Sequence, residues 1–126
     1  MFAKLITGKN HIKNSEVCQD NWRAYYSINN KLTILVLSDG AGSSKKSNIG
    51  SKLICEEIIN ECSNYTIKEI KDREWWIKLI KNVHHEILNN DKNNNLQDYR
   101  ATLIAAIISH EENLILTTHI GDGYIL

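Results

Sequence analysis

The order of the apolar segments limits the fold of this chain more strongly than any other feature of its sequence. Apolar runs of strand length occupy residues 2–7, 22–28 and 32–38 before a long central region, and residues 101–109 and 113–120 after it. Two segments of the central region repeat apolar residues at helical spacing. Strands grouped at both ends with a helix pair between them predict an α+β domain. Both helices should pack together on one face of an antiparallel sheet.

The two helices are expected from their apolar stripes. The first should begin with Ser47 or Asn48 as its N-cap, because these polar residues directly precede an apolar stripe. The second should cover residues 73–89, where Trp75 and Trp76 belong to the stripe and are expected in the core. Polar segments without periodicity predict two loops, at residues 8–20 and 89–98.

One domain, spanning residues 1–126, is expected from the length of the chain. The 15 basic and 15 acidic residues leave no net charge, which argues against binding nucleic acid through bulk electrostatics. No apolar run approaches the length of a membrane span, and the N-terminal segment lacks the apolar core of a signal peptide. We therefore expect no nucleic-acid partner, no membrane partner and a cytoplasmic location.

The three cysteines, Cys18, Cys55 and Cys62, include no Cys-x-x-Cys pair. This spacing argues against both a disulfide framework and a zinc ribbon. We expect the three side chains to serve as small, partly buried hydrophobic groups.

Three aspartates stand in settings that suit metal binding. Asp20 ends a polar loop, Asp39 follows a buried strand and precedes a glycine, and Asp122 lies between two glycines. Carboxylates and backbone carbonyls are hard oxygen ligands that suit Mg²⁺ or Mn²⁺. Three carboxylates gathered at one sheet edge would repel one another unless cations bound between them. The pattern indicates a divalent-metal site, although Asp39 and Asp122 also fit ordinary turns, in which Asp-Gly is common.

These aspartates belong to three motifs that follow one another along the chain. The motifs are Gly-Lys-Asn-His at 8–11 with Cys-Gln-Asp at 18–20, Val-Leu-Ser-Asp-Gly-Ala-Gly-Ser at 36–43 with Gly-Ser at 50–51, and Ala-Thr-Leu at 101–103 with His-Ile-Gly-Asp-Gly at 119–123. In this order they resemble the metal-dependent protein phosphatase 2C family. The opening motif resembles that of a bacterial branch of the family.

The resemblance implies an α-β-β-α sandwich with a dinuclear Mn²⁺ or Mg²⁺ centre between its two sheets. This chain would represent about half of that domain, its N-terminal half. By resemblance, Asp39 would bridge both metals, Gly40 would supply its carbonyl, and Asp20 would hold one metal directly or through water. Asp122 would take the position that binds a third metal in bacterial members.

The resemblance also implies the reaction. The substrate would be a phosphorylated protein, and a metal-activated water would attack its phosphoserine or phosphothreonine. No side chain would act as the catalytic group, and no covalent enzyme intermediate would form. Many members hold the substrate phosphate with an arginine at a fixed offset before the first metal aspartate. Ser15 stands at that offset here, so His11 or Lys13 is expected to bind the phosphate instead.

The chain also departs from the family in length. Family catalytic domains are much longer, and their later part carries further metal aspartates that this sequence lacks. It is therefore either part of a longer phosphatase or a catalytically incomplete phosphatase-like module that binds a phosphoprotein or a partner chain. A missing C-terminal half or a second copy in a homodimer would cover sheet surface that this half leaves exposed.

Overall fold

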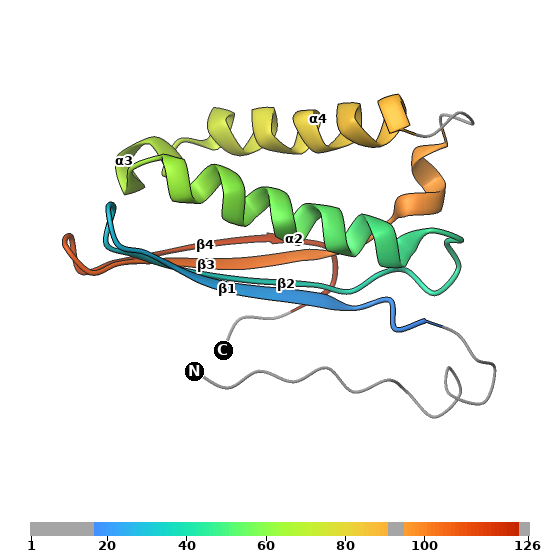
Figure 1. Ribbon diagram of the computed structural model, residues 1–126, viewed down its shortest axis with the longest axis horizontal. Helices are drawn as coiled ribbons and strands as arrows, with labels where there is room; N and C mark the ends of the chain where they lie inside the picture. The colour runs from blue at the N-terminus through green and yellow to red at the C-terminus, as the bar shows by residue number, and fades with distance from the viewer. Residues whose placement is uncertain (1–16, 91–94, 124–126) are drawn as a thin grey trace.

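The computed structural model describes residues 17–90 and 95–123 and contains one sheet and one helical layer (Figure 1). The expected strand at residues 2–7, and most of the expected loop at 8–20, lie outside the described residues. The elements are β1 (Asn21–Ser27), β2 (Leu32–Ser38), α2 (Ser47–Asn64), α3 (Ile67–Ile70), α4 (Arg73–Asn90), the 3-10 helix η1 (Leu96–Tyr99), β3 (Leu103–Ser109) and β4 (Leu114–Ile120).

The sheet is antiparallel throughout, with strand order β1-β2-β3-β4. Two tight hairpins form its outer pairs, and each contains one residue in the left-handed region, Lys31 with φ of 49° and Asn113 with φ of 50°. Asn tolerates this region better than most residues do. The central pairing joins β2 to β3 across the whole helical region, so the expected α+β architecture is confirmed.

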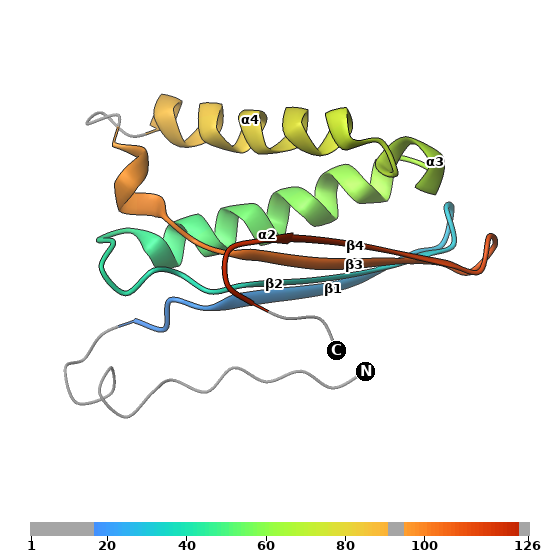
Figure 2. The same ribbon diagram turned by 180° about the vertical axis from the view of Figure 1, so that it is seen from behind.

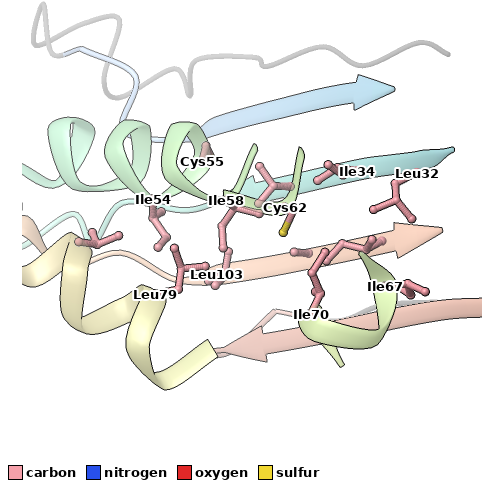
Figure 3. Packing of buried hydrophobic residues seen from close by; sticks show 14 of the residues in the cluster. Leu32, Ile34, Ile54, Cys55, Ile58, Cys62, Ile67, Ile70, Leu79 and Leu103 are labelled. Atoms are coloured by element: carbon pink, nitrogen blue, oxygen red, sulfur yellow. The ribbon is translucent and has the colours of Figure 1, made fainter. Parts of the chain in front are cut away.

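Both long helices lie on the same side of the sheet (Figures 1 and 2). Helix α2 packs directly on β1 and β2, and α4 packs on α2. Alternate residues of each central strand face the helices and are buried, as Ile34 in β2 and Ile107 in β3 illustrate. Figure 3 shows how Ile54 and Ile58 of α2 meet these strands. The predicted packing of two helices on one sheet face is confirmed.

The beginning of the first helix differs from the prediction. Helix α2 begins at Ser47, its N-cap is Lys46, and no side chain caps it. The Ser47 hydroxyl donates instead to the carbonyl of Ser44, at 3.1 Å, and so stabilises the preceding turn. The prediction of Ser47 or Asn48 as N-cap was therefore wrong, because a local side-chain bond to the loop replaces the cap.

Two short helices were not predicted. Thr66 and Glu69 form a capping box that starts α3. The Glu69 carboxylate accepts hydrogen bonds from the N–H and the hydroxyl of Thr66. Helix η1 overlaps the end of the expected loop at 89–98, where the Asn95 side chain accepts from the N–H of Gln97. Hydrogen bonds of polar side chains start both helices, and such bonds produce no apolar periodicity from which the sequence could predict them.

The aromatic and sulfur residues lie largely where they were expected. Trp75 and Trp76 are partly buried against the core and contact each other edge to face, with ring centroids 5.1 Å apart. Cys55 and Cys62 are fully buried in α2, whereas Cys18 is half-buried. All three are free thiols.

The other face of the sheet carries the remaining alternate side chains. Leu35, Leu37, Ile104, Ile108 and Ile115 belong to this face, and Leu37 and Ile115 are 45% and 62% exposed. In the part of the chain that the structure describes, no helix or second sheet covers it (Figure 2). No described helix combines the length and apolarity needed to cross a membrane.

Candidate functional site

A pocket of about 290 Å³ lies at the sheet edge where β2 ends. In an antiparallel sheet, the end of β2, the beginning of β3 and the end of β4 meet at one edge. The segments beyond these strand ends therefore come together, at the same end of the molecule as η1 (Figures 1 and 2). The pocket is lined by Asp39, Ala41, Arg100, Ala101, Thr102 and Asp122.

Asp20 and Asp39 lie side by side at this edge. The first residue of β1, Asn21, pairs with Ser38 at the end of β2, so the residues just outside this pair are neighbours. A hydrogen bond with the Asp20 side chain is the largest cause of the raised pKa of Asp39. Partial burial and repulsion from the carboxylates of Asp20 and Asp122 raise the pKa of Asp39 further. The structure thus brings two predicted site residues into contact.

Asp122 is near this pair without being joined to it. It lines the same pocket as Asp39 and raises the pKa of Asp39 through charge repulsion. Within residues 17–90 and 95–123, however, no three His, Cys, Asp or Glu side chains lie close enough together to hold a metal ion. The two observations agree, because charge repulsion acts over longer distances than coordination bonds of roughly 2.0–2.6 Å.

Gly40 fills a position that no larger residue could occupy. It faces Ala101 in an isolated antiparallel bridge, flanked by hydrogen bonds from Ala41 N to Arg100 O (2.9 Å) and from Thr102 N to Asp39 O (2.8 Å). In such a bridge the N–H and carbonyl of Gly40 itself point away from its partner. A Cβ atom on Gly40 would lie 2.6 Å from the Gln19 carbonyl oxygen, so only glycine allows this approach.

The Gly40 carbonyl, which the family resemblance assigns to metal binding, accepts no hydrogen bond from the residues that the structure describes. Two touching carboxylates, a third beside them and a free carbonyl are the hard oxygen donors that Mg²⁺ and Mn²⁺ prefer. A cation at this edge would also relieve the repulsion that raises the pKa of Asp39. The chemistry of the donor set therefore fits a divalent metal.

The segment that carries Asp20 is fixed by the first turns of α2. The buried hydroxyl of Ser51 donates to the Gln19 carbonyl, and it accepts from the Asn21 side-chain amide at 2.8 Å. These bonds hold the residues on both sides of Asp20. Ser51 belongs to one of the sequence motifs, but the sequence alone assigned it no role.

Thr102 holds Asp39 from the opposite side. The Asp39 N–H donates to the Thr102 hydroxyl at 3.0 Å, while the Thr102 N–H donates to the Asp39 carbonyl at 2.8 Å. The Thr102 methyl group also packs against Gly121, which has φ of +109°. A Cβ on Gly121 would lie 2.7 Å from this methyl carbon. Thr102 therefore positions both Asp39 and the glycine before Asp122, a role that its motif did not reveal.

The remaining predicted residues can be placed only in part. His11 and Lys13, the expected phosphate-binding residues, lie outside the described residues. Arg100 lines the pocket although the sequence analysis did not single it out. It directly precedes the Ala-Thr-Leu motif at 101–103, and a cation beside that motif was the signal that could have found it.

Comparison with known proteins identifies related sequences and folds. The family described as protein phosphatase 2C matches residues 7–126. The crystal structure of a bacterial serine phosphatase superposes with a TM-score of 0.59 at 19% identity, and the match covers 85% of this chain and 43% of the phosphatase chain. The serine/threonine phosphatase Stp1 from Staphylococcus aureus gives a TM-score of 0.60 at 19% identity, and the match covers 85% of this chain and 42% of the Stp1 chain. No curated protein matches.

Proposed function

The chain belongs to the protein phosphatase 2C family, and we propose that it forms the metal-binding first half of a Ser/Thr protein phosphatase domain. The chain spans less than half of the two solved phosphatases that it resembles. The observation that carries the proposal is that Asp20 and Asp39 meet just beyond the Asn21–Ser38 pair, beside the pocket that Asp39 and Asp122 line. Two carboxylates in contact favour a cation between them.

Asp20, Asp39 and the backbone carbonyl of Gly40 would hold metal at the dinuclear centre, and Asp122 would hold a further ion beside it. When bound, Mn²⁺ or Mg²⁺ would activate water for attack on phosphoserine or phosphothreonine and would neutralise charge on the phosphoryl oxygens. The chain's own contribution is positioning. Ser51 fixes the segment before Asp20, and Thr102 holds the backbone of Asp39 on both its N–H and its carbonyl.

The phosphate of the substrate would bind beside these carboxylates. His11 and Lys13 remain our proposed phosphate-binding residues from the N-terminal motif. Because the net charge of the chain is zero, attraction of a phosphoprotein must come from local cations and bound metal. We propose a cytoplasmic location for the protein.

A second function is favoured by the uncovered apolar face of the sheet. A chain that covers less than half of its solved relatives, and whose described residues form one sheet with an uncovered face, could be a catalytically incomplete module that binds a phosphoprotein or a partner chain. Leu37 and Ile115 would then lie under a second copy or under the C-terminal remainder of a longer polypeptide. The two functions differ in turnover, because only the first requires hydrolysis.

The test is Mn²⁺ binding, followed by electron paramagnetic resonance, to the chain and to its Asp39→Asn and Asp20→Asn variants. Asp72→Asn is the matched control, since Asp72 is exposed, caps the start of α4 and lies far from the pocket. We expect the two site variants to lose at least ten-fold in affinity, whereas the control should bind as the parent chain does. Equal Mn²⁺ affinity in all four proteins would refute the metal site.

Hydrolysis of a phosphothreonine peptide then separates the two functions. Turnover that requires Mn²⁺ and is lost in Asp39→Asn would support the phosphatase. Mn²⁺ binding without turnover, by this chain and by any longer polypeptide that contains it, would support the incomplete module.

A further inference from the structure

Arg100 is placed at the candidate metal site by the β2–β3 pairing. It lies immediately before Ala101, which pairs with Gly40, and it lines the same pocket as Asp39 and Asp122. Of the described residues that line this pocket, Arg100 alone carries a positive charge. We propose that Arg100 binds the phosphate group of the substrate beside the metal site, an inference that rests on the proposed function.

The Arg100 side chain is held in place by two hydroxyl groups. Its Nε donates to the Ser44 hydroxyl at 3.1 Å, and one terminal nitrogen donates to the Ser43 hydroxyl at 3.0 Å. Its backbone carbonyl accepts from Ala41 N at 2.9 Å. Ser44 is itself anchored, because its buried hydroxyl donates to the Gln97 carbonyl at 2.9 Å. A guanidinium fixed in this way loses little conformational entropy when it binds an anion.

The guanidinium retains unused binding capacity. It has five N–H donors, and the two bonds to serine use one each. Within the described ranges 17–90 and 95–123, no carboxylate lies within salt-bridge distance of Arg100. The side chain is exposed, so a phosphate in the pocket can reach it. A guanidinium with free donors matches the planar, paired acceptor geometry of a phosphate group.

The surrounding charge gives this cation a specific task. A phosphate that approaches Asp39 and Asp122 is repelled by both carboxylates. Metal ions relieve this repulsion at the reacting oxygens, and a fixed guanidinium on the pocket wall would relieve it at another phosphoryl oxygen. The alternative is that Arg100 only ties the segment at 41–44 to the segment before β3. A tether would affect the folding stability of the protein without affecting its affinity for phosphate.

The two roles can be separated by titrating inorganic phosphate into the chain. In the presence of Mg²⁺, NMR follows the Arg100 Nε–Hε resonance of the parent chain as phosphate is added. Calorimetry measures the phosphate affinity of the parent chain and of the Arg100→Lys and Arg100→Met variants. Arg73→Met is the matched control, because Arg73 begins α4 beside α3, at the opposite end of the molecule (Figure 1). Thermal unfolding of each variant reports folding separately.

We expect phosphate to shift the Arg100 resonance and Arg100→Met to weaken phosphate binding roughly ten-fold or more. Arg100→Lys should lose less, because it keeps the charge without the fork, and Arg73→Met should bind as the parent chain does. Equal phosphate affinity in the parent chain and Arg100→Met would overturn the inference, as would equal losses in Arg100→Met and Arg73→Met.

The same samples distinguish this failure from failure of the proposed function. Mn²⁺ affinity, measured for the same proteins without Mg²⁺ and before phosphate is added, depends on the aspartates and not on Arg100. Mn²⁺ binding combined with unchanged phosphate affinity in Arg100→Met would overturn the Arg100 assignment alone. Absence of Mn²⁺ binding in the parent chain would overturn the metal site and, with it, the inference that rests on that site.

Discussion

Gly50 offers the sharpest test of how the helical layer positions the candidate site, because two physical effects predict opposite signs. It lies in the first turns of α2, where alanine should stabilise an ordinary helix by about 1 kcal/mol relative to glycine. A Cβ at this position, however, would lie 2.0 Å from the backbone carbonyl oxygen of Tyr99 in η1. Two non-bonded atoms cannot approach this closely, and a backbone oxygen cannot move aside by a side-chain rotation.

Gly50→Ala should therefore destabilise the protein. Accommodating the methyl group would push η1 away from α2, an overpacking that costs about 1–3 kcal/mol or more. A 2.0 Å approach to a backbone atom places this cost at the upper end of the range, about 2–3 kcal/mol. After the gain of about 1 kcal/mol in helix propensity is subtracted, the net loss should be about 1–2 kcal/mol, which lowers Tm by roughly 3–10 °C for a domain of this size. Urea unfolding followed by circular dichroism measures the free energy directly.

Gly42→Ala is the matched control. Gly42 is exposed, and the nearest atom to its added Cβ would be the Gln19 side-chain oxygen at 3.7 Å, an ordinary contact. Its free energy of unfolding should change by less than about 0.5 kcal/mol. A Gly50→Ala variant as stable as the parent chain would contradict the close packing of η1 on α2. It would also weaken the placement of Arg100, which directly follows η1.

Three further predictions concern a hydrogen bond, buried thiols and a pH dependence. Thr102→Val keeps the methyl contact but loses the hydroxyl that accepts the N–H of Asp39, so Mn²⁺ binding should weaken several-fold. Thr102→Ser should retain most of the Mn²⁺ affinity measured by electron paramagnetic resonance. Equal losses in both variants would contradict a role for the hydroxyl. Burial raises the pKa of the Cys55 and Cys62 thiols to about 12. At pH 8 both should stay unmodified by iodoacetamide in the folded protein and react once it unfolds, and mass spectrometry that finds rapid native labelling would show that the α2 core opens. Hydrogen bonds from the Thr66 N–H and hydroxyl lower the pKa of Glu69. The contribution of Glu69 to stability is therefore complete above its unfolded-state pKa and disappears as pH falls through the lower folded-state pKa. Glu69→Gln should remove this part of the pH dependence of urea unfolding, and an unchanged pH profile would contradict the role of these hydrogen bonds.

The fold was predictable wherever one segment carried its own signal. The β2 strand was placed at its observed bounds, because a run of aliphatic residues ends sharply at Asp39-Gly40. The start of α2 was wrong because the Ser47 hydroxyl bonds to the loop rather than to the helix. Helix η1 depends on the Asn95 side chain, which caps its start, and on Gly50, which leaves room for the Tyr99 backbone. Neither feature produces an apolar periodicity in the sequence.

The candidate site was predictable to a smaller extent. The side chains of Asp20 and Asp39 were expected to share one sheet edge, and the β1–β2 register brings them into contact. The hydrogen bonds of Thr102 to Asp39 could not be predicted, because they depend on which residue of β2 faces which residue of β3. The alternation of apolar residues decides which face of each strand is buried, but no turn joins β2 to β3 to fix their register.

The central strand pairing also has a consequence for folding. Each outer hairpin closes over a short turn, but the bond from the Ser38 hydroxyl to the Thr102 carbonyl joins residues 64 positions apart. Closing so long a loop is entropically unfavourable until the helices have docked, so the β2–β3 pairing should form late. Pulsed hydrogen exchange during refolding should then protect the hairpin amides before the amide of Thr102, and simultaneous protection would rule out this order. Asp39 would meet Thr102, Arg100 and Asp122 only in this last step, so a partly folded chain would hold no more of the candidate site than the Asp20–Asp39 pair.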